Sequence, residues 1–109
     1  LADLAVVPGE WAEYRAAHPS RPALVVEVSE SSLTFDRSEK GSLYARAGIG
    51  DYWIVNLVDG VLEVYREPEP DPTALYGWRY RVARRLQRAD VVSPLALPSV
   101  RVGVAALLP

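Results

Sequence analysis

The sequence predicts a single α+β domain, spanning residues 1–109, in which a mixed β-sheet packs against helices. The chain has 109 residues, of which 50% are hydrophobic, so it can bury one core but is too short for two domains. Apolar segments of strand length alternate with turn signals, and one longer segment, residues 34–47, carries apolar side chains at helical spacing. A helix between strands, followed by a hairpin and further strands, favours a mixed sheet.

The first half of the chain is expected to contain two strands and two helices. Residues 3–7 form a short apolar strand, and residues 10–17 have helical character. Residues 23–29 include a continuous β-branched run, which is typical of a strand covered on both faces. The helix at residues 34–47 follows a polar turn, and Gly48 is well placed to end it.

The second half is expected to add strands joined by turns. Asp59 and Gly60 give a strong hairpin signal, and residues 67–73, with three prolines among acidic residues, are expected to form a solvated loop. The expected strands are residues 52–56, 61–66, 78–86 and 100–108.

Composition excludes several classes of protein. The formal net charge of −2 argues against a generally basic nucleic-acid-binding surface, although a local basic patch remains compatible with it. The absence of cysteine excludes disulfides and thiolate metal sites. No run reaches the length of a membrane span and no signal-peptide pattern opens the chain, so a soluble cytoplasmic protein is expected.

The chain begins at Leu1, within a predicted strand. We therefore expect an amino-terminal part of the domain to be missing from it. An exposed apolar patch is expected where that part, or a second subunit in a homodimer, would pack.

Lys40, the only lysine of the chain, falls on the stripe of the predicted helix that should be buried. That stripe also holds Leu43, Tyr44 and Ala47, at the spacing of one helix face. A buried ammonium group requires a carboxylate partner or a polar cavity. The preceding strand carries Glu27 within an apolar run, so we expect a hydrogen bond or a short water-bridged path between Glu27 and Lys40.

Each of these residues also has a simpler interpretation. Asp36 lies four residues before Lys40, and such a pair is commonly a surface salt bridge. Glu27 could reach solvent from an edge strand, and Asp3, which opens the first strand, could be a turn or cap residue. His18, the only histidine, precedes a proline in a loop and is interpreted as structural or exposed.

Two stretches of the sequence resemble the Uma-two family of restriction-type endonucleases, in the PD-(D/E)XK nuclease superfamily. The first is LVVEVSESS at residues 24–32. The second, residues 36–55, holds Asp36, Lys40, the run YARAGI and the run YWIV. The resemblance extends over nearly the whole chain and implies a restriction-endonuclease-like fold.

The resemblance also implies a catalytic and metal-binding site. Asp3 matches the aspartate of the PD motif, and Glu27 matches the acid of the second half-motif. These two carboxylates, with the backbone carbonyl of Val28, would hold Mg²⁺ or Mn²⁺. Ser29 stands at the position where nucleases of the superfamily usually have a lysine. In the Uma-two family the resemblance implies that this lysine is on the following helix instead, and Lys40 matches it.

The implied function is a metal-dependent endonuclease that hydrolyses DNA phosphodiester bonds. Hydrolysis requires a metal ion to polarise the phosphoryl group and to lower the pKa of bound water, and Lys40 would orient that water or stabilise the transition state. The alternatives are a catalytically silent binding or assembly module with the nuclease fold, and a structural domain in which Asp36 and Lys40 form only a surface pair.

A cluster of arginines is the best candidate for contacts with DNA phosphates. A solvated surface is the simpler interpretation of the same residues. The acidic segment at residues 67–71 is expected to face away from DNA. The cluster consists of Arg79, Arg81, Arg84, Arg85 and Arg88.

Overall fold

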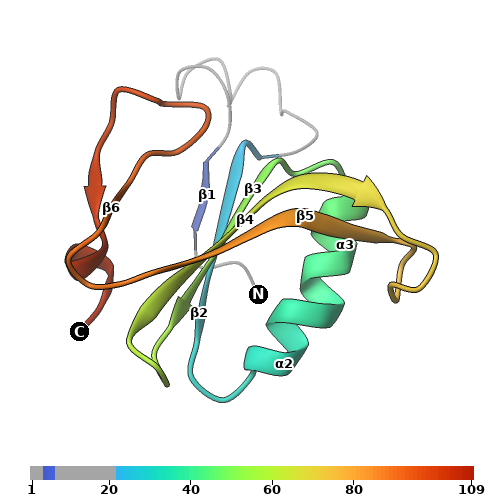
Figure 1. The fold of residues 1–109 in the computed structure, drawn as a ribbon, viewed down its shortest axis with the longest axis horizontal. Coiled ribbons are helices and arrows are strands. Elements are labelled where there is room, and N and C mark those ends of the chain that lie inside the picture. Colours follow the sequence, from blue (N-terminus) through green and yellow to red (C-terminus); the bar gives the residue numbers. More distant parts are fainter. Residues whose placement is uncertain (1–3, 7–21) are drawn as a thin grey trace.

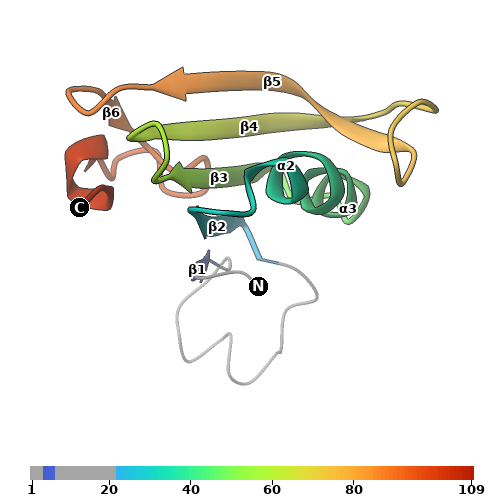
Figure 2. The same cartoon turned by 90° about the horizontal axis from the view of Figure 1, so that it is seen from below.

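The structure, a computed structural model, describes residues 4–6 and 22–109 of the chain. Within these residues one sheet has the strand order β1-β2-β3-β4-β5 (Figures 1 and 2). β2 and β3 are parallel and the other neighbouring strands are antiparallel. The α+β class with a mixed sheet is therefore confirmed. The strands are β1 (Leu4–Val6), β2 (Leu24–Ser29), β3 (Asp51–Asn56), β4 (Val61–Pro70) and β5 (Trp78–Leu86).

The crossover between the parallel strands β2 and β3 contains one continuous helical segment. It starts as α2 (Leu33–Phe35), continues through a π-helical turn, η1 (Asp36–Lys40), and ends as α3 (Gly41–Arg46). Gly48, with φ of 78°, terminates it in the left-handed conformation that was expected of this glycine. The Ile49 amide donates to the Tyr44 carbonyl at 3.1 Å, which completes the usual helix-ending motif.

The prediction of which residues of this helix are buried was wrong in detail. The most buried positions of the segment are Asp36, Gly41, Ser42 and Ala45. The predicted members Leu43 and Ala47 are exposed, whereas Lys40 and Tyr44 are half-buried at the edge of the contact face. The π-helical turn adds backbone between Asp36 and Gly41, so it rotates the face that a regular helix would have buried.

The sheet has an apolar core on each face. The helical segment lies on one side of the sheet and the carboxyl-terminal segment on the other (Figure 1). The core beneath the helical segment is small and rich in tyrosine: Val25, Ile49, Tyr52 and Ile54 are buried, with Tyr44, Tyr65 and Tyr80 packed against them. The core on the opposite face is larger and is completed by the carboxyl-terminal segment: Leu24, Val26, Trp53, Val55, Leu62, Val64, Leu86, Val92, Val104 and Leu108.

Two predictions for the second half of the chain need correction. β4 continues to Pro70, where a solvated loop was expected from Glu67, because it pairs with β5 as far as Trp78. β3 pairs with β4 only as far as Arg66, so the prolines beyond that point lie in a two-stranded ribbon with one open side.

The carboxyl-terminal strand is also shorter than predicted. β7 (Val102–Gly103) pairs with β6 (Val91–Val92), and a 3-10 helix, η2 (Val104–Leu107), follows it. The Val104 amide donates to the Asp90 carbonyl at 2.9 Å, and the Val104 side chain is fully buried in the larger core. Core packing at this residue therefore ends the strand.

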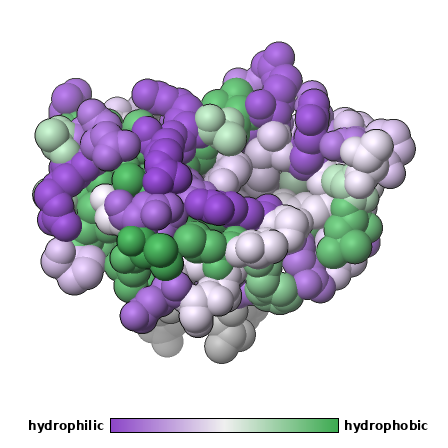
Figure 3. All heavy atoms as spheres, turned by 60° about the horizontal axis from the view of Figure 1, so that its bottom comes forward, coloured by the Kyte–Doolittle hydropathy of each residue, from purple (hydrophilic) through white to green (hydrophobic). Residues whose placement is uncertain are grey.

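Large apolar side chains are exposed at several places in the described residues. On the face in Figure 3, hydrophobic areas are separated by hydrophilic side chains. The expected contiguous apolar patch stays a prediction. The exposed residues are Val28, Phe35, Leu43, Val58, Leu75, Val91, Leu95, Leu97 and Val100.

Candidate functional site

Glu27 is a buried carboxylate on the helix-facing side of β2. Its residue is 2% exposed, and its neighbours Val25 and Ser29, two positions away along the strand, are buried as well. The Tyr44 hydroxyl donates to Glu27 Oε2 at 2.7 Å. Glu27 therefore does not reach solvent, and the edge-strand interpretation of this residue is excluded.

Lys40 brings its ammonium group to this carboxylate from the π-helical turn. Lys40 Nζ lies 3.2 Å from Glu27 Oε2 and 3.4 Å from Asp36 Oδ1, and its side chain is 16% exposed. The expected contact between Glu27 and Lys40 is confirmed. The Asp36–Lys40 pair also exists, but as part of a mostly buried cluster rather than as a surface bridge.

The protonation states in this cluster follow from burial and charge. Burial alone would lower the pKa of Lys40, but hydrogen bonding and the negative charges of Glu27 and Asp36 act in the opposite direction, and the net pKa lies above its usual range, so the ammonium stays charged. Burial and the hydrogen bond to Glu27 raise the pKa of Tyr44, so its hydroxyl remains a donor. The cluster thus presents a fixed cation and a fixed hydrogen-bond donor to Glu27.

Asp36 is the residue whose importance the sequence interpretation underestimated. Its residue is 2% exposed, and its Oδ2 accepts a hydrogen bond from Ser32 Oγ at 2.9 Å. Its backbone carbonyl accepts one from the buried Tyr52 hydroxyl at 2.8 Å. A serine four residues before the aspartate, and a lysine four residues after it, were the available signals.

Asp3, the second expected metal ligand, lies outside the described residues, as does His18. Val28 follows Glu27 in β2, and its backbone carbonyl remains a predicted ligand. Residues 4–6 and 22–109 contain no group of three or more histidine, cysteine, aspartate or glutamate side chains that could hold a metal ion. The described part of the site therefore supplies the carboxylate of Glu27 but not a complete set of ligands.

A family model matches residues 2–105. It is the Uma2 model, with the description "Putative restriction endonuclease". The chain belongs to this family. The match covers almost the whole chain, so the resemblance to the family is confirmed. The fold is compatible with the restriction-endonuclease-like architecture that the Uma2 family implies.

No curated protein matches the chain. Among the described residues, no helix has the length and apolar character needed to cross a membrane.

In this Uma2 chain a second buried carboxylate lies in the same transverse row of the sheet as Glu27. Ile54 on β3 pairs with Glu27 on one side and with Glu63 on β4 on the other. Arg37, in the same π-helical turn as Lys40, donates to both Glu63 oxygens, at 2.9 and 2.5 Å. Two cations of one helical turn therefore engage two carboxylates on either side of Ile54.

The Glu63 carboxylate is strongly held. Burial alone would raise its pKa, but hydrogen bonds from Arg37, Tyr65 and Asn56 outweigh it and lower the pKa to about 2. Sequence interpretation missed this residue, although Glu63 interrupts an apolar strand just as Glu27 does. The bidentate pair clamps the π-helical turn onto the sheet.

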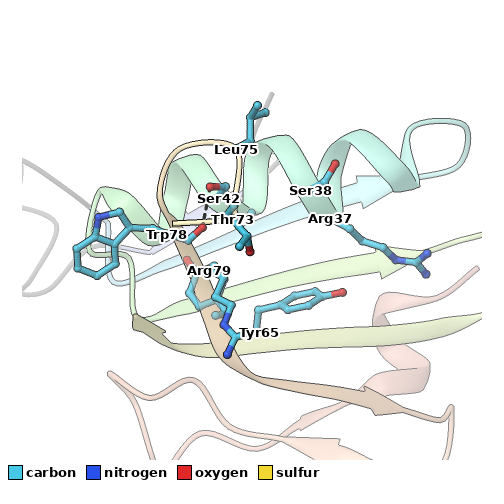
Figure 4. Close-up of a pocket in the computed structure, with 11 residues that line it drawn as sticks. Arg37, Ser38, Ser42, Tyr65, Thr73, Leu75, Trp78 and Arg79 are labelled. Atoms are coloured by element: carbon cyan, nitrogen blue, oxygen red, sulfur yellow. Dashed lines mark hydrogen bonds between the residues drawn. The ribbon is translucent and has the colours of Figure 1, made fainter. Parts of the chain in front are cut away.

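Two hollows adjoin this clamp on the side away from Glu27. The first, about 340 Å³, lies between the helical segment and the β4–β5 ribbon (Figure 4). Arg37 and Ser38 line it from the helix, and Tyr65 and Trp78 line it from the strands. The second, about 310 Å³, is lined by Arg37, Glu63, Tyr65, Ala83, Arg84 and Arg85. Neither hollow is lined by Glu27 or Lys40.

Two arginines of β5 are paired with glutamates of the acidic segment at residues 67–71. Arg79 Nε lies 2.8 Å from Glu69 Oε2, and Arg81 forms an ion pair with Glu67. β4 continues beside β5 and brings its glutamates across from these arginines. The expectation that the acidic segment faces away from DNA stays a prediction.

The remaining arginines of the cluster differ from one another. Arg85 pairs with Asp59 at 3.0 Å, and Arg88 donates to the Pro109 carbonyl at 3.1 Å. Arg84 lines the second hollow and makes no ion pair within the described part of the chain. Contacts between these arginines and DNA stay predictions.

Proposed function

We propose that the protein is a metal-dependent endonuclease that hydrolyses DNA phosphodiester bonds. The observation that carries this proposal is the buried Glu27–Lys40 contact, at 3.2 Å, in a chain of a restriction endonuclease family. Burial of a carboxylate and an ammonium is costly, and replacing such a pair by apolar side chains is often neutral for stability. A functional role for the pair is the simplest reason for its presence.

The oxygen donors around Glu27 suit Mg²⁺ or Mn²⁺. Mg²⁺ prefers carboxylate and carbonyl oxygens and commonly keeps waters or substrate phosphates as further ligands. Glu27 would provide one carboxylate and Val28 its backbone carbonyl. β1 pairs Leu4 with Val26, the neighbour of Glu27, and Asp3 is the residue before Leu4 in the sequence. We therefore propose Asp3 as the second carboxylate ligand.

A bound divalent ion would polarise the phosphoryl group and lower the pKa of a bound water. Lys40 would orient the attacking water or stabilise the negative charge that develops in the transition state, because its ammonium is charged and largely shielded from solvent. The Tyr44 hydroxyl would fix the rotamer of Glu27 by its hydrogen bond.

Among the β5 arginines, Arg84 is our first candidate for a contact with a DNA phosphate. It has no carboxylate partner within the described residues, whereas Arg79, Arg81 and Arg85 would each have to exchange an existing ion pair for a phosphate. Arg88, which lies just beyond the end of β5, is a further candidate. A substitution of Arg84 should weaken DNA binding uniformly over different sequences.

Plasmid cleavage with Mg²⁺ or Mn²⁺ tests the proposal, using the whole protein and the variants Glu27→Ala and Lys40→Ala. Both variants should lose activity by at least about a hundredfold. Glu27→Ala should also abolish the rise in melting temperature on addition of Mg²⁺, whereas Lys40→Ala should retain it because an ammonium is no metal ligand.

Glu30→Ala is the matched control, since Glu30 is an exposed glutamate just beyond the same strand. It should cleave DNA and respond to Mg²⁺ as the wild type does. Cleavage by Glu27→Ala at the wild-type rate would remove Glu27 from the mechanism. DNA binding by a folded wild-type protein without any cleavage would instead favour the catalytically silent module.

A further inference from the structure

Asp36 has an unusual environment for an acidic residue of a helix. Its residue is 2% exposed, and its Oδ1 accepts no hydrogen bond from the described part of the chain. The ammonium of Lys40 lies 3.4 Å from this oxygen. Leaving a buried carboxylate oxygen without a hydrogen bond is costly, so the charge of Lys40 must compensate for it.

Asp36 is also fixed by hydrogen bonds that do not involve Lys40. Ser32 donates to its Oδ2, and Tyr52 donates to its backbone carbonyl. The next residue, Arg37, is fixed by the bidentate contact with Glu63. The aspartate therefore cannot follow Lys40 if the lysine moves, and it defines where the ammonium can rest.

We propose that Asp36 is a positioning residue that retains the Lys40 ammonium in the site when the Glu27 carboxylate is engaged by a divalent ion. This inference rests on the proposed function. Lys40 Nζ now lies within 3.4 Å of both carboxylates. A divalent ion at Glu27 would repel the ammonium. Asp36 offers the counter-charge that keeps Lys40 from leaving for solvent.

A simple helix-stabilising pair would not have these properties. Exposed aspartate–lysine pairs at this spacing contribute little to helix stability and leave both side chains free to move. Glu39, one residue before Lys40, provides the comparison within the same turn. It has the same charge, but its carboxylate faces the Tyr76 hydroxyl at 3.3 Å rather than Lys40.

The single lysine of the chain makes a direct test available. Reductive methylation with ¹³C-formaldehyde modifies only Lys40 and the amino terminus, and NMR distinguishes the two products. The rate of Lys40 modification is measured with and without Mg²⁺ in the wild type, Asp36→Asn and the control Glu39→Gln. Circular dichroism and thermal unfolding establish that each variant is folded.

In the wild type and in Glu39→Gln, Mg²⁺ should change the modification rate by less than about twofold. In Asp36→Asn it should increase the rate by at least about fivefold, because the displaced ammonium has lost a charged partner. The kcat for plasmid cleavage should fall about tenfold or more, while the affinity for Mg²⁺ measured by calorimetry stays within about threefold of the wild type. Ser32→Ala, which releases Asp36 Oδ2, should show a smaller effect of the same sign.

Two results would overturn the inference while leaving the proposed function intact. One is an Asp36→Asn protein that cleaves DNA at the wild-type rate and protects Lys40 equally in Mg²⁺. The other is an Asp36→Asn protein that no longer binds Mg²⁺, which would make Asp36 a metal ligand. A wild type that neither binds Mg²⁺ nor cleaves DNA would overturn the proposed function itself, and this inference with it.

Discussion

Replacing Glu63 by glutamine should destabilise the protein by about 3 kcal/mol at pH 7. The contacts of Glu63 lower its pKa from 4.5 to about 2, and each unit of difference corresponds to about 1.4 kcal/mol. Removing one partner of a buried ion pair costs about 3–5 kcal/mol in other proteins. The lower end applies here, because the Arg37 side chain is 40% exposed and would regain water.

The loss should depend on pH with a definite sign. A carboxyl group whose pKa is lowered by folding stabilises the folded state fully above its unfolded pKa, and that contribution disappears as the pH falls toward the folded pKa. The difference between wild type and Glu63→Gln should therefore be constant above about pH 5 and shrink between about pH 4.5 and pH 2. Glutamine resembles the protonated acid in shape, so the two proteins should converge in this window.

Urea denaturation at a series of pH values measures this difference directly, because the other titrating groups are common to both proteins. Glu69→Gln is the control: Glu69 pairs with Arg79 on the open ribbon, where the Arg79 side chain is 59% exposed, and its loss should cost less than about 1 kcal/mol. A Glu63→Gln protein within about 1 kcal/mol of wild type at pH 7, or with the same deficit near pH 2, would refute the reasoning.

Two further substitutions test the parts of the fold that support the site. Asp51→Asn should lower the free energy of unfolding, measured by urea denaturation, by about 2–4 kcal/mol. The buried Asp51 carboxylate accepts hydrogen bonds from Trp53, Arg66 and Leu95, and a single amide oxygen cannot accept all three. Hydrogen exchange at the Leu95 amide should therefore become faster. Gly48→Ala should lower the free energy of unfolding by about 1 kcal/mol or more, because φ is 78° at this position. The control Gly50→Ala should lower it by less, because no atom lies within 4 Å of the added carbon. Equal losses for the two glycines would contradict this explanation.

The parts of the fold that follow from local patterns were predictable from the sequence. β2 and β3 are rich in β-branched and aromatic residues, β5 alternates apolar residues with arginines over its first half, and the observed bounds of all three agree closely with the predicted ones. The contact between Glu27 and Lys40 was predictable for a similar reason, since each is a charged residue in an otherwise apolar pattern.

Features that depend on tertiary partners were not predictable in this way. Asp36 is the buried residue of the π-helical turn, and the sequence gives no clear signal for such a turn. The extension of β4 beyond Arg66 depends on β5, whose arginines compensate the charges of Glu67 and Glu69. A solvated acidic loop is the natural expectation until the pairing strand is known.

The proposed site has its cation on the helix, at Lys40, whereas the superfamily motif usually has a lysine on the strand, at the position of Ser29. Ser29 is fully buried on the same face of β2 as Glu27, and its Oγ lies 3.4 Å from Ser32 Oγ. Ser32 in turn donates to Asp36, whose other oxygen lies 3.4 Å from Lys40 Nζ. Position 29 and Lys40 are therefore linked through one polar chain.

Lys40 thus reaches the Glu27 carboxylate from the helical wall of the site instead of from the strand. A cation on the helix is useful only if the helix is fixed relative to the strand. The bidentate contact between Arg37 and Glu63 supplies that restraint within the same turn, on the other side of Ile54. The contact between Arg37 and Glu63 therefore fixes the helical turn from which Lys40 reaches Glu27.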